Sequence, residues 1–131
     1  MSAFIVESKN QPGQLARLCE AMAARDLNII VSGVAHDDSG TVAFVADDEA
    51  AARSALTNAG IEFAEREALT VRLENIAGAG AAMFRALADA NVNIELLLPV
   101  RVSDEHFFAV ICAQNLDVAR QALGEHVINP E

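Results

Sequence analysis

The sequence predicts an α+β fold in which the element order β-α-β-β-α-β occurs twice in succession. Two loops of the form Asn-x-x-Gly, at residues 10–13 and 75–78, lie 65 residues apart. Each is followed at the same distance by a Leu-Asn-Ile or Val-Asn-Ile triplet, at residues 27–29 and 92–94. Farther along, residues 52–56 match residues 119–123 with an offset of 67. The period is longer than a solenoid unit and occurs only twice, so we expect each copy to form a small domain.

Each copy is expected to open with a strand and continue with a helix. Apolar and other residues alternate over residues 4–7 and 69–73, which is the period of a half-buried strand. Between Gln14 and Arg25, apolar residues recur at helical spacing. The equivalent segment around Met83 to Ala90 is rich in strong helix formers.

Two β-rich runs then form a predicted hairpin in each copy. In the first copy they cover residues 29–36 and 41–47, and residues 37–40 (Asp-Asp-Ser-Gly) supply the turn. In the second copy they cover residues 94–102 and 106–113. The connection at 103–105 contains no glycine, so we expect a longer loop there, and Pro99 indicates a sheet edge or a bulge.

A second helix and a last strand complete each copy. Asp48 and Asn115 are predicted N-caps of helices over residues 49–59 and 116–123, and Gly60 and Gly124 end those helices. The last strand of the first copy, residues 61–67, runs directly into the next copy, while its counterpart at 127–129 is cut short by Pro130. This order is the ferredoxin-like arrangement, with two helices on one face of a four-stranded antiparallel sheet. We expect the domains to cover residues 1–67 and 68–131.

Composition excludes several classes of partner. The chain has 131 residues, 53% of them hydrophobic, and a net charge of -10, which argues against binding to DNA or RNA. Lys9 is the single lysine, and no segment resembles a basic amphipathic or membrane-spanning helix, so no membrane partner is expected. The first residues do not resemble a secretion signal, and we expect a cytoplasmic location.

An apolar strand predicts association. Residues 107–112 are apolar on both sides, so the face away from the helices should also be buried, by the other repeat or by a second chain. We therefore expect a homo-oligomer; the alternative is that these residues meet a long loop. Cys19 and Cys112 lie in apolar contexts at non-equivalent positions, which favours structural thiols over a disulfide or a nucleophile.

Motifs of catalysis are absent from the sequence. It has no C-x-x-C pair, H-E-x-x-H helix, G-x-S-x-G turn or phosphate-binding G-x-x-x-x-G-K-[ST] loop, and its three histidines have no second ligand at metal-binding spacing. We predict no catalytic residue, no metal site and no cofactor. The segment from Gly78 to Gly80 begins like a dinucleotide-binding loop, but Met83 occupies the position of the third glycine.

The repeated polar loop is the candidate binding feature. In each copy a strand ends at Asn, Gly follows three residues later, and a helix begins at once, which directs free N–H groups and the positive end of a helix dipole at one spot. A carboxylate fits there, and glycine permits a positive φ or a close ligand. The alternative is a simple turn, with Asn28 and Asn93 as the left-handed residues that end the helices.

These residues resemble an ACT domain, a small regulatory module with the β-α-β-β-α-β fold. Asn10-Gln11-Pro12-Gly13-Gln14-Leu15 is similar to the N-x-P-G-x-L loop of that family, and the triplets at 27–29 and 92–94 resemble its Asn-Ile start of the second strand. The resemblance covers the whole chain as two tandem domains.

The resemblance implies two ligand sites, each at a seam between the loop of one domain and the second strand of its partner. One site would combine Asn10, Pro12, Gly13, Gln14 and Leu15 with Asn93, Ile94 and Glu95. The other would combine Asn75, Gly78, Ala79 and Gly80 with Asn28, Ile29 and Ile30. In the second loop Ala77 replaces the proline and Gly80 the leucine, so that loop should be more flexible.

By the same resemblance, the chain is expected to be a free-standing regulatory subunit or sensor. Its ligand would be a free amino acid, and its partner an enzyme of amino-acid metabolism. Two alternatives remain open: a small enzyme on a ferredoxin-like scaffold, and an assembly module without a ligand.

Overall fold

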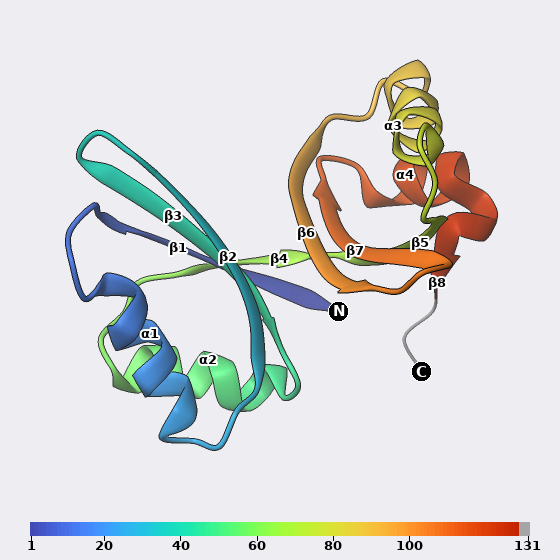
Figure 1. Cartoon of the computed structure of the whole chain (residues 1–131). Helices are drawn as coiled ribbons and strands as arrows, with labels where there is room; N and C mark the ends of the chain where they lie inside the picture. The colour runs from blue at the N-terminus through green and yellow to red at the C-terminus, as the bar shows by residue number, and fades with distance from the viewer. Residues whose placement is uncertain (129–131) are drawn as a thin grey trace. The chain divides into compact units, whose positions relative to one another are not determined.

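The predicted order of elements occurs twice in the computed structural model, which describes residues 1–128 (Figure 1). The first repeat contains β1 (Ser2–Lys9), α1 (Gln14–Ala23), β2 (Ile29–His36), β3 (Ser39–Ala46), α2 (Glu49–Asn58) and β4 (Ala64–Glu67). The second contains β5 (Leu69–Glu74), α3 (Ala79–Asp89), β6 (Ile94–Val102), β7 (His106–Ala113), α4 (Leu116–Leu123), a 3-10 turn η1 (Gly124–His126) and β8 (Val127–Ile128).

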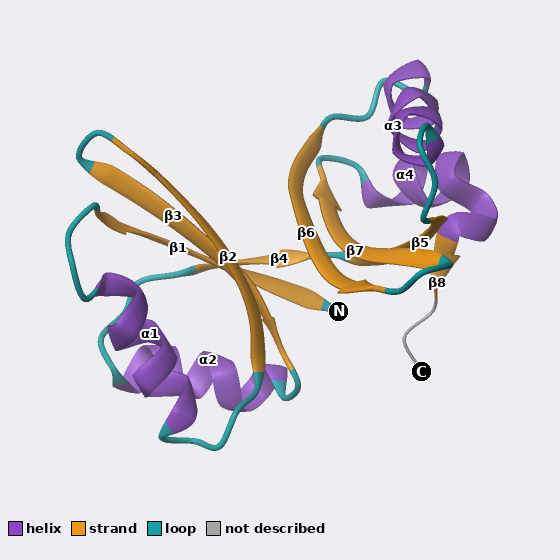
Figure 2. Ribbon diagram, viewed as in Figure 1, coloured by secondary structure: helices purple, strands orange, loops and turns teal. Residues whose placement is uncertain are grey.

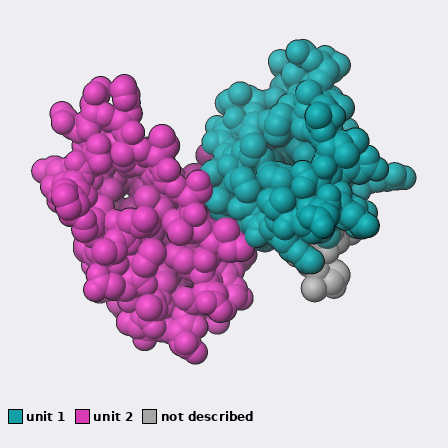
Figure 3. Space-filling model, viewed as in Figure 1, with its two compact units in different colours: residues 1, 67–131 teal, residues 2–66 magenta. Residues whose placement is uncertain are grey.

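Each repeat forms one four-stranded sheet with two helices on one face (Figure 2). The strand orders are β2-β3-β1-β4 and β6-β7-β5-β8, so the third strand of each repeat pairs with both its first and its second strand. The predicted fold class is confirmed. The chain divides into two compact units, one of residues 2–66 and one that begins at Glu67 and also includes Met1 (Figure 3).

Each unit has its own apolar core between sheet and helices. In the first unit, Phe4 and Phe44 stack on neighbouring strands with ring centroids 5.2 Å apart, and Met22 and Leu56 come from the helices. In the second unit the equivalent layer is aliphatic, with Val71 and Ile111 on the strands and Met83 and Leu87 on α3. The two-residue alternation in the strands and the helical spacing of apolar residues in the helices produce these layers.

Both faces of β7 are buried, as the sequence predicted. Ala109 and Ile111 belong to the core below the helices. Val110 and Cys112 alternate with them on the other face, and each is only 1% exposed. The cysteines are not joined in a disulfide.

Helix starts follow the prediction, and helix ends differ from it. Asp48 accepts a bond from Ala51 N–H at 3.0 Å, and Asn115 accepts one from Val118 N–H at 3.2 Å, which confirms both N-caps. The first helix ends at Ala23 instead of continuing to Arg25. The left-handed residues after α1 and α3 are Asp26 (φ 55°) and Asn91 (φ 59°), so the alternative assignment of that role to Asn28 and Asn93 is wrong.

The hairpins match the prediction except at one turn. The connection between β6 and β7 is the longer one, as predicted, and β6 is an edge strand with a register break between Pro99 and Arg101. In the first hairpin β3 already begins at Ser39, and Asp37 takes the positive φ of 53°. Gly40 therefore lies inside the strand, because aspartate tolerates the left-handed region well enough to make the turn.

The last strand of the first repeat is shorter than predicted. Pairing begins at Ala64, three residues after the expected start at Ile61. Ile61 is 8% exposed and belongs to the core, and Phe63 packs against that core, so an apolar run that resembles a strand serves as packing here. Of the expected strand at 127–129, Val127–Ile128 is confirmed, and Asn129 lies outside the described residues.

Candidate functional site

The loop after β1 is fixed by its asparagine. Asn10 Nδ2 donates to the Asp37 carbonyl at 3.0 Å, and the Asn10 backbone N–H donates to the Asp38 carbonyl at 2.9 Å. The side chain thus ties the end of β1 to the hairpin between β2 and β3. A turn residue without a side-chain donor, such as aspartate, could not make the first of these bonds.

Gly13 sets the direction in which α1 begins. Its φ of 93° and ψ of -9° belong to the left-handed region, which glycine adopts without steric cost. Within residues 1–128, no side chain caps α1, so the N–H groups of its first turn have no capping side chain as acceptor. Pro12 and Gly13 are exposed, Gln14 is half-buried, and Leu15 is 50% exposed beside these amides.

The second loop repeats this geometry. Asn75 Nδ2 donates to the Ser103 carbonyl at 2.9 Å, and its backbone N–H donates to the Glu105 carbonyl at 2.9 Å. Gly78 has φ 93° and ψ -16°, and in the described chain α3 also begins without a side-chain cap. Two chain segments with different sequences have therefore folded into the same uncapped helix start.

The two loops differ in what surrounds the helix start. In the second loop Ala79 N–H donates to the Ile76 carbonyl at 3.3 Å, which engages one of the first-turn amides. Gly80 lies inside α3 and offers no side chain where the first loop has Leu15. The first loop thus has the apolar side chain of Leu15 beside its amides, and the second has no side chain at the equivalent Gly80.

The starts of the second strands lie at the opposite end of each sheet. Lys9 and His36 both pair with Ser39, whereas Ile29 pairs with Ala46. Seven strand steps separate Ile29 from His36, which is about 23 Å at the usual rise per residue. In the second repeat, Glu74 pairs with His106 and Ile94 pairs with Ala113, again at opposite ends.

This register has a consequence for any ligand. A repeat cannot bring its own loop to the start of its own second strand. A ligand that touches both features must therefore lie between two repeats, of one chain or of two. The pairing of each loop with the second strand of the other repeat remains a prediction.

The predicted residues at the strand starts have different surroundings. The Asn28 carbonyl accepts from Asp47 N–H at 3.2 Å, and its side chain is exposed. Ile29 and Ile94 pack against the cores, whereas Ile30 is 43% exposed on the face away from the helices. Of the predicted residues at the strand starts, Asn28, Ile30, Asn93 and Glu95 are exposed.

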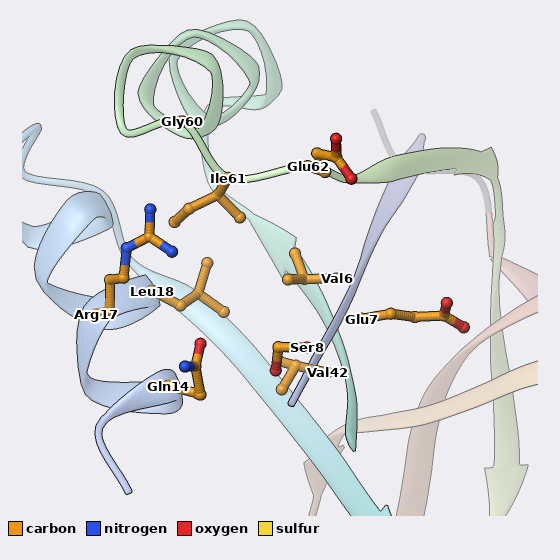
Figure 4. A pocket seen from close by; sticks show the side chains of 10 residues that line it. All are labelled: Val6, Glu7, Ser8, Gln14, Arg17, Leu18, Val42, Gly60, Ile61 and Glu62. Atoms are coloured by element: carbon orange, nitrogen blue, oxygen red, sulfur yellow. The ribbon is translucent and has the colours of Figure 1, made fainter. Parts of the chain in front are cut away.

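The structure contains two cavities that were not predicted from the sequence, at equivalent places in the two repeats. The first, of about 190 Å³, lies between the end of β1, the start of α1 and residues 60–62 (Figure 4). Figure 4 shows Leu18, Ile61 and Val6 at its centre, while the side chain of Glu7 extends away from them. Arg17 stands at the rim, where its Nη2 donates to the Ala59 carbonyl at 2.9 Å, at the end of α2.

The cavity of the second repeat is wider and has different polar groups. It measures about 810 Å³ and lies between the end of β5, the start of α3 and the 3-10 turn. Ala82 replaces Arg17 at the equivalent position, and Arg72, His106 and His126 join the lining. Both cavities border the predicted loops, through Gln14 in the first repeat and through Gly78 and Ala79 in the second.

The described residues contain few groups suited to acid–base or metal chemistry. In residues 1–128 there is no buried polar or charged side chain and no cluster of three or more potential metal ligands. Hydrogen bonds between Arg53 and Glu65 raise the pKa of the guanidinium and lower the pKa of the carboxyl, and neither residue lines either cavity. No helix within the described part of the chain is long and apolar enough to cross a membrane.

Comparison with known proteins identifies the fold. The sequence matches no family model and no curated protein. Among solved structures, protein BT0572 from Bacteroides thetaiotaomicron is similar over 97% of this chain and 90% of its own, with a TM-score of 0.86 at 20% identity. The regulatory subunit of aspartate kinase from Thermus thermophilus is similar over 95% of this chain and 91% of its own, with a TM-score of 0.71 at 22% identity.

The corresponding subunit from Thermus flavus gives a TM-score of 0.63 at 23% identity, over 95% of this chain and 90% of its own. At these identities the likeness concerns the fold. The predicted fold of two tandem β-α-β-β-α-β repeats is thus confirmed over nearly the full chain.

Proposed function

We propose that this chain is a cytoplasmic, non-catalytic regulatory subunit that binds a free α-amino acid between two ACT-like repeats and acts on an enzyme of amino-acid metabolism. The observation that carries the proposal is the duplicated helix start. Gly13 and Gly78 take the same left-handed conformation, and each precedes a helix without a side-chain cap.

The helix start suits the carboxylate of an amino acid. Backbone N–H groups of the first turn can donate to its oxygens, and the positive end of the helix dipole favours its charge. The asparagine side chains hold these loops in place through the hairpins, so little ordering is needed when a ligand arrives. The opposite-end placement of Ile29 and Ile94 supports a site shared between repeats.

The proposed role and partner rest on the fold likeness. The Thermus proteins of this fold are named as regulatory subunits of aspartate kinase, and they have nearly the same extent as this chain. A domain with this fold, an amino-acid site and no catalytic constellation would act by changing the state of a partner enzyme. We also propose that the chain forms a homo-oligomer.

A thermal-shift screen of the free L-amino acids tests ligand binding. At a concentration about 100-fold above the dissociation constant, a ligand specific for the folded state stabilises it by about 2.7 kcal/mol. The matched control is the amide of the same amino acid, which lacks the carboxylate and should give a much smaller shift. If no amino acid raises the melting temperature, the amino-acid sensor is excluded and the assembly module is favoured.

A further inference from the structure

The cavity of the first repeat has an apolar floor, formed by Val6, Leu18 and Ile61. These three side chains meet at its centre (Figure 4), belong to the core of the repeat, and are at most 8% exposed. Val42 of β3 extends the apolar lining. The cavity measures about 190 Å³. An engineered apolar cavity of about 150 Å³ binds benzene, so a branched apolar side chain of a ligand fits in this one.

The charged groups of the lining lie away from this floor. They are Glu7, Arg17 and Glu62, and all three residues are exposed. The Glu7 side chain extends away from the floor (Figure 4), and Arg17 Nη2 donates to the Ala59 carbonyl at 2.9 Å. A charged ligand side chain inside the cavity would therefore lose its hydration without gaining a buried counter-charge. The cavity thus favours an apolar occupant.

Two uncharged polar residues of the lining connect the cavity to the first loop. Ser8 lies near the end of β1, and Gln14 is the first residue of α1. Both are half-buried, and within residues 1–128 neither side chain has a hydrogen-bond partner. A molecule whose polar end lies at the start of α1 can bond to these groups while its apolar part enters the cavity.

The cavity of the second repeat does not offer the same selection. It measures about 810 Å³, and its lining includes Arg72, His106 and His126 together with Glu74 and Glu125. A ligand side chain in this wider space would lie among charged groups and water. Polar and apolar side chains should therefore differ less in their affinity for the second repeat.

We infer that the amino acid bound at the first loop has a branched apolar side chain, of about the size of leucine, which fills the cavity of the first repeat. The inference rests on the proposed amino-acid site and names the class of its ligand. The carboxylate then lies at the first-turn amides of α1, and the side chain passes Gln14, which belongs both to that turn and to the cavity lining.

Thermal-shift titrations of the wild-type protein with matched amino acids test the inference. Free asparagine and aspartate have nearly the shape of leucine and the same α-amino and α-carboxylate groups, so a difference in affinity reports the side chain alone. Leucine should bind about tenfold or more tightly than either, because their polar side chains find no partners at the apolar floor. Lysine should bind no better than asparagine.

The possible results separate this inference from the proposed function. If asparagine, aspartate or lysine binds as tightly as leucine or more tightly, the inference is overturned and the amino-acid site stands. If no amino acid binds, the site itself is refuted, and the inference with it.

Two leucine variants test where the ligand side chain lies. Leu18 lines the cavity, whereas Leu56 belongs to the same core but does not line it. Leu18→Ala and Leu56→Ala should both lower the melting temperature. Only Leu18→Ala widens the cavity, so only this variant should shift the ratio of the dissociation constants of leucine and phenylalanine, by about tenfold in favour of phenylalanine. An equal shift in both variants, or none in Leu18→Ala, would overturn the inference.

A milder pair of variants decides the question if Leu18→Ala does not fold. Val42 and Val31 are partly buried valines that pack against the same core, and only Val42 lines the cavity. Val42→Leu narrows the cavity and should weaken the binding of free leucine more than that of free valine, whose side chain is shorter. Val31→Leu should leave this ratio unchanged. Far-UV circular dichroism shows that each variant is folded. The same ratio in both variants would contradict the placement of the ligand side chain.

Discussion

Arg53 of α2 and Glu65 of β4 join these two elements by two hydrogen bonds. Arg53 Nε donates to Oε1 at 2.7 Å, and Nη2 donates to Oε2 at 2.6 Å. These bonds, with a further one from Ser2, hold the pKa of Glu65 at about 2, below its ordinary value of 4.5. Because the folded-state pKa is depressed, the stabilisation is present above pH 4.5 and is lost as the pH falls towards 2.

We therefore predict that Glu65→Gln removes part of the acid dependence of stability. The urea midpoint of the wild type should fall between pH 6 and pH 3 more than that of the variant. Both side chains are partly exposed, so solvent screening keeps the effect modest. Asp89→Asn is the control, because the exposed Arg85–Asp89 pair at 4.0 Å should contribute little. Identical pH profiles for Glu65→Gln and wild type would contradict the prediction.

Some roles of single residues could be predicted from the sequence and others could not. The positive φ of Gly13 and Gly78 could be predicted, because a strand followed at once by glycine and a helix is a local pattern. The bonds from Asn10 and Asn75 to the hairpins could not, because their acceptors lie 27 and 28 residues away. The asparagines in the loop pattern thus have a structural task besides any contact with a ligand.

At the scale of elements, Gly13 at the start of α1 and Gly80 in the first turn of α3 should respond to alanine in opposite directions. A Cβ at Gly13 would meet nothing within 4 Å, so Gly13→Ala should destabilise the fold only through the backbone strain of alanine at a φ of 93°. We expect destabilisation by about 1 kcal/mol or more. Gly80 has no positive φ, and its added Cβ would touch Phe84 Cε2 at an ordinary 3.6 Å. Gly80→Ala should stabilise α3 by about 0.4–1 kcal/mol.

Chemical denaturation of the two variants measures both effects on the same protein. Gly78→Ala provides the internal comparison, because Gly78 has the same φ as Gly13 and likewise open space around its added Cβ. Gly78→Ala should therefore resemble Gly13→Ala. If Gly13→Ala were neutral, the left-handed helix start would not be required by the fold.

Elements with a clear period were predicted well, and elements defined by tertiary packing were not. The bounds of β6, β7 and α4 agree with the prediction because their periods and caps are local. The prediction that the last strand of the first repeat begins at Ile61 was wrong, because Ile61 turns into the core while the backbone separates from β1. The first cavity lies at that separation, so no local pattern of residues could predict it.

At the scale of the whole molecule, duplication predicts two similar sites, and divergence makes them unequal. Both loops share the anchoring asparagine and the left-handed glycine. Pro12 restrains the first loop, and Leu15 adds an apolar wall. The second loop has Ala77 and Gly80 at these positions. Greater backbone freedom before binding should weaken the second site by about 1 kcal/mol.

Titration calorimetry on Asn10→Ala and Asn75→Ala tests this asymmetry. The two changes remove equivalent bonds, to the Asp37 carbonyl at 3.0 Å and to the Ser103 carbonyl at 2.9 Å. Each should therefore lower stability by a similar amount, about 0.5–1.5 kcal/mol. Any difference in amino-acid affinity then reflects the sites and not the folding of the loops. Asn10→Ala should abolish most of the binding heat and Asn75→Ala little of it. Equal losses would show two equivalent sites, and a larger loss in Asn75→Ala would show that the open backbone at Gly80 accepts the ligand better than the wall formed by Leu15.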